Sequence, residues 1–239
     1  MVSTVIKNWD NKTWLSSKSY IQSFNRFILK QIKLRKNSKI LDIGCGRGKI
    51  IGCLSSKIQL KSKPIGIDLV NHRDKDKRIE FKKMDALSFF LSNKKKFDLI
   101  LIKQTIHLLK ISDIRKLISN CKKSLNPEGI ILIFTLDPRK NELPSFKMME
   151  KKLNKSFKRD FKISNLLLKL STSRILKRFV FRVKITKKQY LKMLQMRFIS
   201  TLLSMSKKDL LNGVEEINLR YKHILKFNDN LICISLNNN

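Results

Sequence analysis

The chain has 239 residues, 42% of them hydrophobic, and a formal net charge of +35 from 53 basic and 18 acidic side chains. This length and apolar content predict one domain with a substantial core and an additional segment attached to it. No segment approaches the roughly 20 apolar residues of a membrane span, and the stretch from Met1 to Trp14 lacks the apolar centre of a signal peptide. Four scattered cysteines without paired ligand spacing predict reduced thiols in a cytoplasm and no metal centre.

The N-terminal segment carries aromatic side chains on a helical pattern. Residues 9–27 are predicted to form a helix that precedes the first strand. Trp14 and Tyr20 on this helix are candidates for substrate contacts, with simple packing as the alternative. Residues 1–36 are accordingly assigned to an N-terminal helical lid.

A glycine-spaced loop follows the first predicted strand, and it is the main chemical signal of the chain. Asp42 precedes Gly44, Gly46 and Gly48, and a helical pattern comes next. Glycine has no Cβ, so such a loop turns tightly and lets a ligand lie against bare backbone. The following helix offers free N–H groups and the positive end of its dipole. The G-x-G-x-G spacing departs from the G-x-G-x-x-G dinucleotide fingerprint.

Acidic residues follow the next two predicted strands. The segment 64–68 ends in Asp68, which lies twenty residues after Gly48. In Rossmann-like folds an acid near this spacing accepts hydrogen bonds from ribose hydroxyls. The short segment 79–81 then leads to Asp85.

Two apolar strands complete the series. The segment 97–102 leads to Lys103 and Gln104, and the segment 130–134 follows the turn 125–129. Continuous apolar runs of this kind are typical of strands buried on both faces of a parallel sheet. Ligands in such sheets bind beyond the carboxyl ends of the strands, and Asp42, Asp68, Asp85 and Gln104 all fall at or just after strand ends.

Helical patterns alternate with these strands. The clearest spans Ser112 to Ser124, with Ser112 as the expected N-cap. Strands that alternate with helices indicate an α/β, doubly wound, Rossmann-like sheet that is mostly parallel.

In this order the motifs resemble those of the class I S-adenosylmethionine-dependent methyltransferases, over residues 37–136. The resemblance implies that the glycine loop holds the amino acid portion and sugar of the cofactor. It implies further that Asp68 binds the ribose diol and Asp85 the adenine amino group. The cofactor-binding residues implied in this way are Asp42, Gly44, Cys45, Gly46, Gly48, Asp68, Leu69, Asp85, Ala86, Lys103 and Gln104.

Two further residues need separate interpretation. His107 falls where many small-molecule members of the family carry a histidine near the reaction centre, so it is the candidate catalytic base. It also lies in an apolar run, and a half-buried packing role is the alternative. Arg47 stands where a small residue is commoner in the family, and it is expected either to crowd the loop or to point outward.

The segment after the fifth strand is predicted to be basic and to contain helices and one strand. Residues 151–208 carry 18 basic side chains and one acidic side chain. A helix fits residues 145–157 and a strand fits residues 179–183. The charge has three open explanations: a compositional bias towards lysine, an acidic small substrate, or nucleic acid.

An amphipathic helix is predicted over residues 187–205. Its apolar stripe is expected to pack inward, while the adjoining mixed face carries Tyr190, Arg197 and Ser200. This face is the candidate substrate-binding surface, on which Arg197 clamps a carboxylate or phosphate. A plain surface position for Arg197 is the alternative.

The chain ends with a predicted helix and strand. Ser206 opens a capping-box-like signature for a helix that runs through Tyr221, and residues 231–236 form an antiparallel last strand. The chain is thus divided into the lid at 1–36, an S-adenosylmethionine-binding core at 37–140, a basic substrate-capping insertion at 141–205 and a final helix and strand at 206–239.

The sequence therefore predicts a cytoplasmic enzyme that transfers a methyl group from S-adenosylmethionine to a small molecule, with an acidic acceptor as one open option. One alternative is an RNA methyltransferase that uses the basic surface. Two missing motifs disfavour this alternative. Lys103-Gln104-Thr105 is not the Asn/Asp-Pro-Pro-aromatic motif of adenine methylation, and the Pro-Cys pair of pyrimidine carbon methylation is not present. The other alternative is a Rossmann-like nucleotide-binding protein without methyl transfer. The oligomeric state is not predicted.

Overall fold

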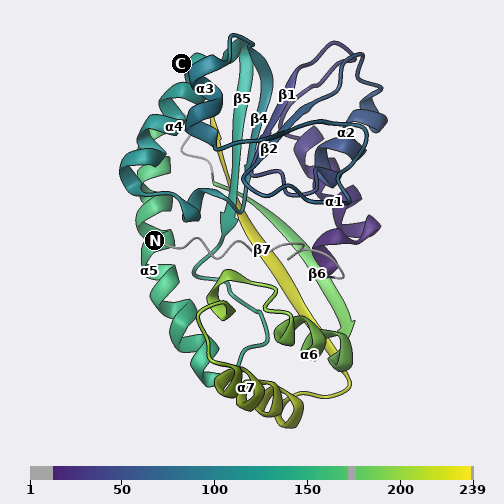
Figure 1. Ribbon diagram of the computed structural model, residues 1–239, viewed down its shortest axis with the longest axis vertical. Helices are drawn as coiled ribbons and strands as arrows, with labels where there is room; N and C mark the ends of the chain where they lie inside the picture. The colour runs from purple at the N-terminus through teal and green to yellow at the C-terminus, as the bar shows by residue number, and fades with distance from the viewer. Residues whose placement is uncertain (1–12, 172–175, 238–239) are drawn as a thin grey trace.

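The computed structural model describes residues 13–171 and 176–237. Within these ranges one sheet has the strand order β3-β2-β1-β4-β5-β7-β6 and carries helices on both faces (Figure 1). The strands are β1 (Ile40–Ile43), β2 (Ile65–Asp68), β3 (Glu80–Lys83), β4 (Phe97–Lys103), β5 (Leu125–Leu136), β6 (Lys177–Thr186) and β7 (Ile224–Leu236). The α-helices are α1 (Lys18–Leu29), α2 (Lys49–Ile58), α3 (Ala86–Ser92), α4 (Ile111–Lys123), α5 (Lys147–Leu170), α6 (Lys187–Gln195) and α7 (Lys207–Arg220). Short 3-10 helices are η1 (Trp14–Ser16), η2 (Ile106–Leu108) and η3 (Ser200–Leu202).

The sheet has a parallel centre and an antiparallel end. β1 pairs in parallel with β2 and β4, and β4 pairs in parallel with β5. β7 is antiparallel to both β5 and β6. The predicted Rossmann-like, doubly wound and mostly parallel sheet is confirmed.

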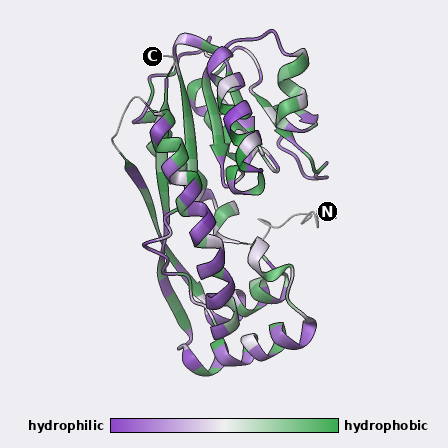
Figure 2. Ribbon diagram, turned by 90° about the vertical axis from the view of Figure 1, so that its left-hand side faces the viewer, coloured by the Kyte–Doolittle hydropathy of each residue, from purple (hydrophilic) through white to green (hydrophobic). Residues whose placement is uncertain are grey.

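Two layers of helices enclose the sheet. On one face α1 and α2 bury their apolar sides in a cluster that includes Phe24, Leu54 and Phe134. On the other face α3, α4 and the second half of α5 pack in a cluster that includes Phe89 and Ile163. The strands at the centre of the sheet are largely green in Figure 2, because most of their residues are hydrophobic. No helix of the described chain is long and apolar enough to cross a membrane.

β6 and β7 form a ribbon that extends past the carboxyl edge of the parallel strands. Leu136, the last residue of β5, pairs with Leu231, whereas the ribbon continues to the pair of Thr186 with Ile224. The helices α6 and α7 connect the far ends of the two strands, so they lie beyond that edge, at the bottom of Figure 1. The segment 141–205 therefore supplies the edge strand β6 as well as part of this cap.

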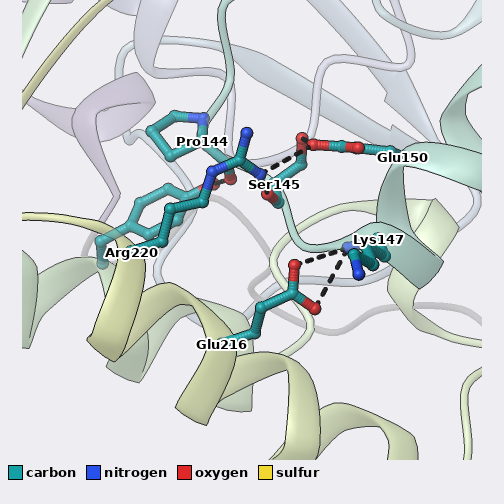
Figure 3. Close-up of polar contacts among 7 residues, drawn as sticks. Pro144, Ser145, Lys147, Glu150, Glu216 and Arg220 are labelled. Carbon is teal, nitrogen blue, oxygen red and sulfur yellow. Dashed lines mark hydrogen bonds and ion pairs between the residues drawn. The ribbon is translucent and has the colours of Figure 1, made fainter.

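Polar contacts hold the cap on the start of α5 (Figure 3). The Glu216 carboxylate accepts hydrogen bonds from the backbone N–H of Lys147, with N–O distances of 3.1 and 3.3 Å. The N-cap residue of α5 provides no side-chain cap of its own, so a residue of α7 satisfies this helix end. Arg220 adds an ion pair with Glu150 at 3.3 Å.

Two helix predictions need correction. α4 begins at Ile111 with Lys110 at its N-cap, so the prediction that Ser112 is the N-cap is wrong. The backbone of Lys110 is extended and the helical turn starts directly after it, which leaves Ser112 in the first turn. α5 begins at Lys147, two residues later than predicted, and it continues to Leu170 through a segment that the sequence leaves ambiguous.

The single helix predicted over residues 187–205 is also wrong. α6 ends at Gln195, and Arg197 takes a left-handed φ of +54° before η3 begins. The break turns the chain so that Phe198 and Leu202 can both be buried. Tyr190, expected on a mixed face, is fully buried beside Leu194.

The last elements agree with the sequence. The Ser206 hydroxyl accepts a hydrogen bond from the Asp209 N–H at 3.0 Å, so the predicted cap of α7 is confirmed. β7 includes the predicted strand 231–236 and begins seven residues earlier, at Ile224. The N-terminal helix is described only in part, because residues 9–12 of the predicted span lie outside the described residues.

Candidate functional site

The glycine loop joins β1 to α2 through three residues in the left-handed backbone region. Gly44, Gly46 and Gly48 have φ values of +72°, +55° and +69°, a region in which residues with a Cβ are strained. The N–H groups of Gly44 and Cys45 donate to the Ile67 carbonyl at 2.8 and 3.0 Å. The loop therefore folds back over the end of β2.

Asp68 at the end of β2 closes this loop. One carboxylate oxygen accepts a hydrogen bond from the Gly46 N–H at 2.8 Å, and the other accepts one from the Val70 N–H at 2.9 Å. An ionised carboxylate offers about two acceptor positions on each oxygen, so each retains capacity for a ligand hydroxyl. The structure thus places the predicted acid directly against the predicted loop.

Two of the glycines have different surroundings. A Cβ on Gly44 would lie 2.1 Å from Thr105 Oγ1, whereas a Cβ on Gly46 would meet no atom within 4 Å. Gly44 therefore permits close contact between the loops after β1 and β4. Gly46 instead presents bare backbone to open space, beside Asp68.

The chain after β4 is held in a fixed conformation against the glycine loop. Gln104 has a φ of +55°, and its N–H donates to the Phe134 carbonyl at 2.8 Å. The Thr105 hydroxyl donates to the Lys103 carbonyl at 3.1 Å. Left-handed conformations in residues other than glycine are costly, and they cluster at ligand-binding sites.

The buried acid Asp42 and the half-buried Lys103 lie at the centre of the site. Burial raises the pKa of the Asp42 carboxyl to about 7, while the charge of Lys103 opposes this rise and that of Asp68 adds to it. The Lys103 ammonium lies 5.3 and 5.5 Å from the ring centroids of Tyr20 and Phe24. This is the geometry of a cation–π contact, which links the end of β4 to α1.

Asp229 on β7 is a buried acid that the sequence did not identify. Trp14 Nε1 donates to its Oδ2 at 3.1 Å. Burial raises the pKa of Asp229, against the influence of Trp14, Lys103 and Tyr20. No motif surrounds Asp229 in the sequence, and only the folding of the ribbon over the N-terminal segment brings it to the site.

Trp14 and Tyr20 are buried residues of the core. Tyr20 meets Phe179 and Phe181 edge-on, with centroid distances of 5.6 and 5.0 Å. Burial, with the nearby Asp229 charge, raises the pKa of the Tyr20 hydroxyl, which has no hydrogen-bond partner of good geometry among the described residues. The role of Trp14 and Tyr20 as substrate contacts stays a prediction.

Asp85 lies at the N-terminus of α3, next to the end of β3. Its Oδ1 accepts hydrogen bonds from the N–H groups of Leu87 and Ser88 at 2.9 and 3.0 Å. Hydrogen bonding to Ser88 and to this backbone holds the pKa of Asp85 below its usual range. Both hydrogen bonds go to the same carboxylate oxygen of Asp85, and Ala86 is the first residue of the helix.

Leu69 follows Asp68 directly, and its side chain is 59% exposed.

Arg47 neither crowds the loop nor points outward. Its guanidinium is buried and lies 2.6 Å from Asp74, and a hydrogen bond from Arg47 lowers the pKa of that acid. The Asp76 N–H donates to the Arg47 carbonyl at 2.8 Å. Residues 69–79, which connect β2 to β3 without a helix, are therefore fixed against the glycine loop.

His107 lies in η2, beneath α5. Burial lowers the pKa of its imidazole to about 4, and the charge of Arg159 on α5 adds to this. Arg159 also donates to the Leu109 carbonyl at 2.5 Å. His107 is therefore neutral at pH 7. Its role as a catalytic base stays a prediction.

Two of the predicted substrate-binding residues of the cap make hydrogen bonds to backbone carbonyls of the protein itself. The Tyr190 hydroxyl donates to the Pro144 carbonyl, and Arg197 donates to the carbonyls of Leu202 and Leu203. Ser200 is exposed at the start of η3. Their part in substrate binding stays a prediction.

Comparison with known proteins places this geometry in a family. A family profile described as a methyltransferase domain matches residues 40–129. The chain is 36% identical over 115 residues to phosphoethanolamine N-methyltransferase of Plasmodium falciparum, a match that covers 44% of this chain and 42% of that protein. It is 30% identical over 120 residues to ubiquinone biosynthesis O-methyltransferase of Pelagibacter ubique, over 46% and 49% of the two chains. The matched region thus spans about half the length of these relatives.

Solved structures with the same fold have low sequence identity. A protein of Anabaena variabilis, assigned as a methyltransferase of an antibiotic biosynthesis pathway, aligns with a TM-score of 0.54 and 15% identity over 88% of this chain and 96% of that chain. The plantazolicin methyltransferase in complex with a monoazolic desmethyl analogue and SAH aligns with a TM-score of 0.50 and 17% identity, over 95% and 87% of the two chains. These similarities show the fold. The profile match and the two relatives identify residues 40–129 as a methyltransferase domain.

Proposed function

We propose that this chain binds S-adenosylmethionine at the carboxyl edge of β1, β2 and β4 and transfers its methyl group to a small molecule. The observation that carries the proposal is the open backbone of Gly46 beside Asp68. A Cβ on Gly46 would meet no protein atom within 4 Å, and Asp68 is held against its N–H. Bare backbone next to an oriented carboxylate suits a ribose bound across the loop.

The other residues at this edge fit the remaining parts of the cofactor. Asp85 uses a single oxygen to cap α3, which leaves the other oxygen for the amino group of the adenine. The exposed Leu69 follows Asp68 and offers an apolar contact for the base. The fixed backbone of Lys103 and Gln104 would hold the methionine portion.

The protein's contribution to the reaction is binding, orientation and exclusion of water. When bound, S-adenosylmethionine supplies an electrophilic methyl group on a sulfonium. Asp42 and Asp68 lie close together at this edge, and the nearby charge of Lys103 opposes the rise in the pKa of Asp42. The cap formed by α6 and α7 lies beyond the same edge, where it would shield an acceptor from solvent.

The class of acceptor is proposed from the named relatives, both of which act on small molecules by their names. An acidic acceptor held by Arg197 gains no support, since the guanidinium already binds the carbonyls of Leu202 and Leu203. A neutral His107 can accept a hydrogen bond from an acceptor hydroxyl or amine.

Calorimetric titration of the full chain with S-adenosylmethionine tests cofactor binding. We expect Gly46→Ala to lose binding, because the added methyl group occupies the proposed ligand space. The strained φ should cost this variant only about 1–2 kcal/mol of unfolding free energy. Absence of binding by the wild-type chain would contradict the proposal.

Incubation with methyl-labelled cofactor identifies the acceptor. A metabolite extract forms one arm and total RNA the other. Label in a small molecule supports the proposal, whereas label found only in RNA establishes the RNA methyltransferase alternative.

The role of His107 can be separated from cofactor binding. We expect His107→Ala to reduce turnover of the acceptor at least about a hundredfold, the lower end of the range for loss of an acid–base group, with unchanged cofactor affinity. Because the pKa of His107 is about 4, its protonation does not change between pH 6 and 8. Titration of His107 should therefore cause no change in wild-type turnover over this range. Full activity of the variant would leave His107 with a packing role only.

A further inference from the structure

The outer face of α5 carries a row of lysines at helical spacing. Lys151, Lys155, Lys158, Lys162 and Lys169 follow one another at intervals of four, three, four and seven residues, and all are exposed. Residues three or four positions apart are neighbours on one helix face. At a rise of 1.5 Å per residue the row is about 27 Å long. Figure 2 turns α5 towards the viewer, and hydrophilic colour runs along its exposed side.

This row has no acidic partners within the described part of the chain. The ion pairs among described residues involve Asp74, Asp76, Glu80, Asp137 and Glu150, and none of them reaches a lysine of the row. Asp160, the other acid of α5, is buried on the inner side. Like charges at this spacing destabilise a helix by about 0.2–0.5 kcal/mol per pair. The row therefore carries a repulsion that a bound polyanion would remove.

An exposed aromatic ring flanks the row. Phe161 is 50% exposed and lies one helical turn after Lys158, at the side of the row. An aromatic ring among cations suits single-stranded nucleic acid, because unpaired bases stack on the ring while the phosphates meet the ammonium groups. The ring distinguishes this surface from the other exposed lysines of the chain.

A membrane surface is the less suitable partner. A helix that binds membranes inserts its apolar side between the lipids. The apolar side of α5 is instead buried in the protein, through residues such as Met149, Leu153, Ile163 and Leu167. Only Met148 and Phe161 remain as exposed large hydrophobic residues on this helix.

We propose that the outer face of α5 binds single-stranded nucleic acid, with the five lysines on the phosphates and Phe161 stacked on a base. This surface is independent of the proposed methyl transfer, because it lies on the outer side of α5 and includes none of the residues assigned to the cofactor.

Fluorescence anisotropy with the full chain tests the proposal. The probes are a labelled single-stranded RNA of about 15 nucleotides, within the range of known single-strand sites, the DNA of the same sequence and the matching RNA duplex. The key variant is K155Q/K158Q/K162Q. The matched control is K57Q/K61Q/K63Q, which removes the same charge from other exposed lysines.

We expect the α5 variant to bind single-stranded RNA about tenfold more weakly and to lower the salt slope by about 2, for three lost phosphate contacts. The control variant should bind as the wild type does. An equal loss in both variants would overturn the proposal, because it would show attraction to net charge alone. Comparison of the RNA and DNA probes shows which nucleic acid is preferred.

Phe161 supplies the second arm. Phe161→Ala should weaken single-strand binding about tenfold with an unchanged salt slope, and Phe161→Trp should restore it. Equal binding of the duplex and single strand, unaffected by Phe161→Ala, would contradict the stacking. Binding of the wild type to phosphatidylserine vesicles, without RNA binding, would show a lipid surface and overturn the proposal.

Discussion

The parallel core and the cap use their polar side chains in opposite ways. In the core, Asp68 and Asp85 are oriented by backbone N–H groups and retain acceptor capacity at the carboxyl edge. In the cap, Tyr190 and Arg197 donate to carbonyls of the cap itself and of the adjoining turn. The cofactor end of the site is therefore built from polar groups with spare capacity. The acceptor end is shaped chiefly by packing, and substitutions in the two regions should have different consequences.

The largest effect is expected at Asp42, where the core buries a carboxyl group. Its native pKa of about 7 lies above the unfolded value of 3.8, so the native state binds more protons between these values. The free energy of unfolding that depends on Asp42 therefore falls as pH rises from about 4 to 7. Relative to wild type, Asp42→Asn should gain roughly 4 kcal/mol between pH 4 and pH 8, measured by urea unfolding.

Asp137 provides the control for this measurement. Although burial alone would raise its pKa, hydrogen bonds from Arg139 and Arg178 outweigh it and lower the pKa. Both its native and unfolded pKa values then lie below pH 5. The difference between Asp137→Asn and wild type should stay constant from pH 5 to 8. A flat profile for Asp42→Asn as well would show that Asp42 is charged in the native state throughout this range.

A somewhat smaller effect is expected at Gly44, where two loops of the core touch. A Cβ there lies 2.1 Å from Thr105 Oγ1 and the φ is +72°, so Gly44→Ala should lose about 3 kcal/mol of unfolding free energy. Thermal and urea unfolding measure the loss. In the Thr105→Ala background the loss should be smaller, because two of the three closest contacts disappear. Equal losses in both backgrounds would mean that backbone strain alone is responsible.

Asp68 tests the cofactor end directly. Asp68→Ala should weaken S-adenosylmethionine binding by roughly 1–3 kcal/mol, the range for hydrogen bonds to a charged group. Asp68→Asn preserves one acceptor oxygen and should retain part of the affinity. Calorimetry on the folded variants gives both values. Unchanged affinity in Asp68→Ala would show that the ribose does not bind at Asp68.

The smallest effect is expected where the cap meets α5. Glu216→Ala removes the acceptor for the Lys147 N–H, and loss of such a cap costs about 1 kcal/mol of unfolding free energy. Glu215→Ala is the control, because Glu215 is exposed on the same helix and makes no hydrogen bond or ion pair with the described residues. Equal stability of the two variants would show that water caps α5 equally well.

The same contrast explains what the sequence could predict. The alternation of strands and helices, the glycine loop, Asp68 and Asp85 follow from local patterns, since the loop and both acids come directly after predicted strands. Asp229 and its contact with Trp14 depend on pairs more than 200 residues apart, which no local pattern encodes. The sequence did not predict the helix break at Gln195, because its apolar residues continue at helical spacing beyond that point. In the fold, the chain leaves the helix and buries Phe198 and Leu202.

The contact of Trp14 with Asp229 bears on how ligands enter and leave. The segment from Trp14 through α1 buries the rings of Tyr20 and Phe24, and its indole binds an acid of the ribbon. Lifting this segment would expose both rings and leave Asp229 without its donor, so it amounts to local unfolding rather than a hinge motion. Any exchange that required it would occur at the rate of that unfolding event. Hydrogen exchange of the α1 amides would then set the upper limit for turnover.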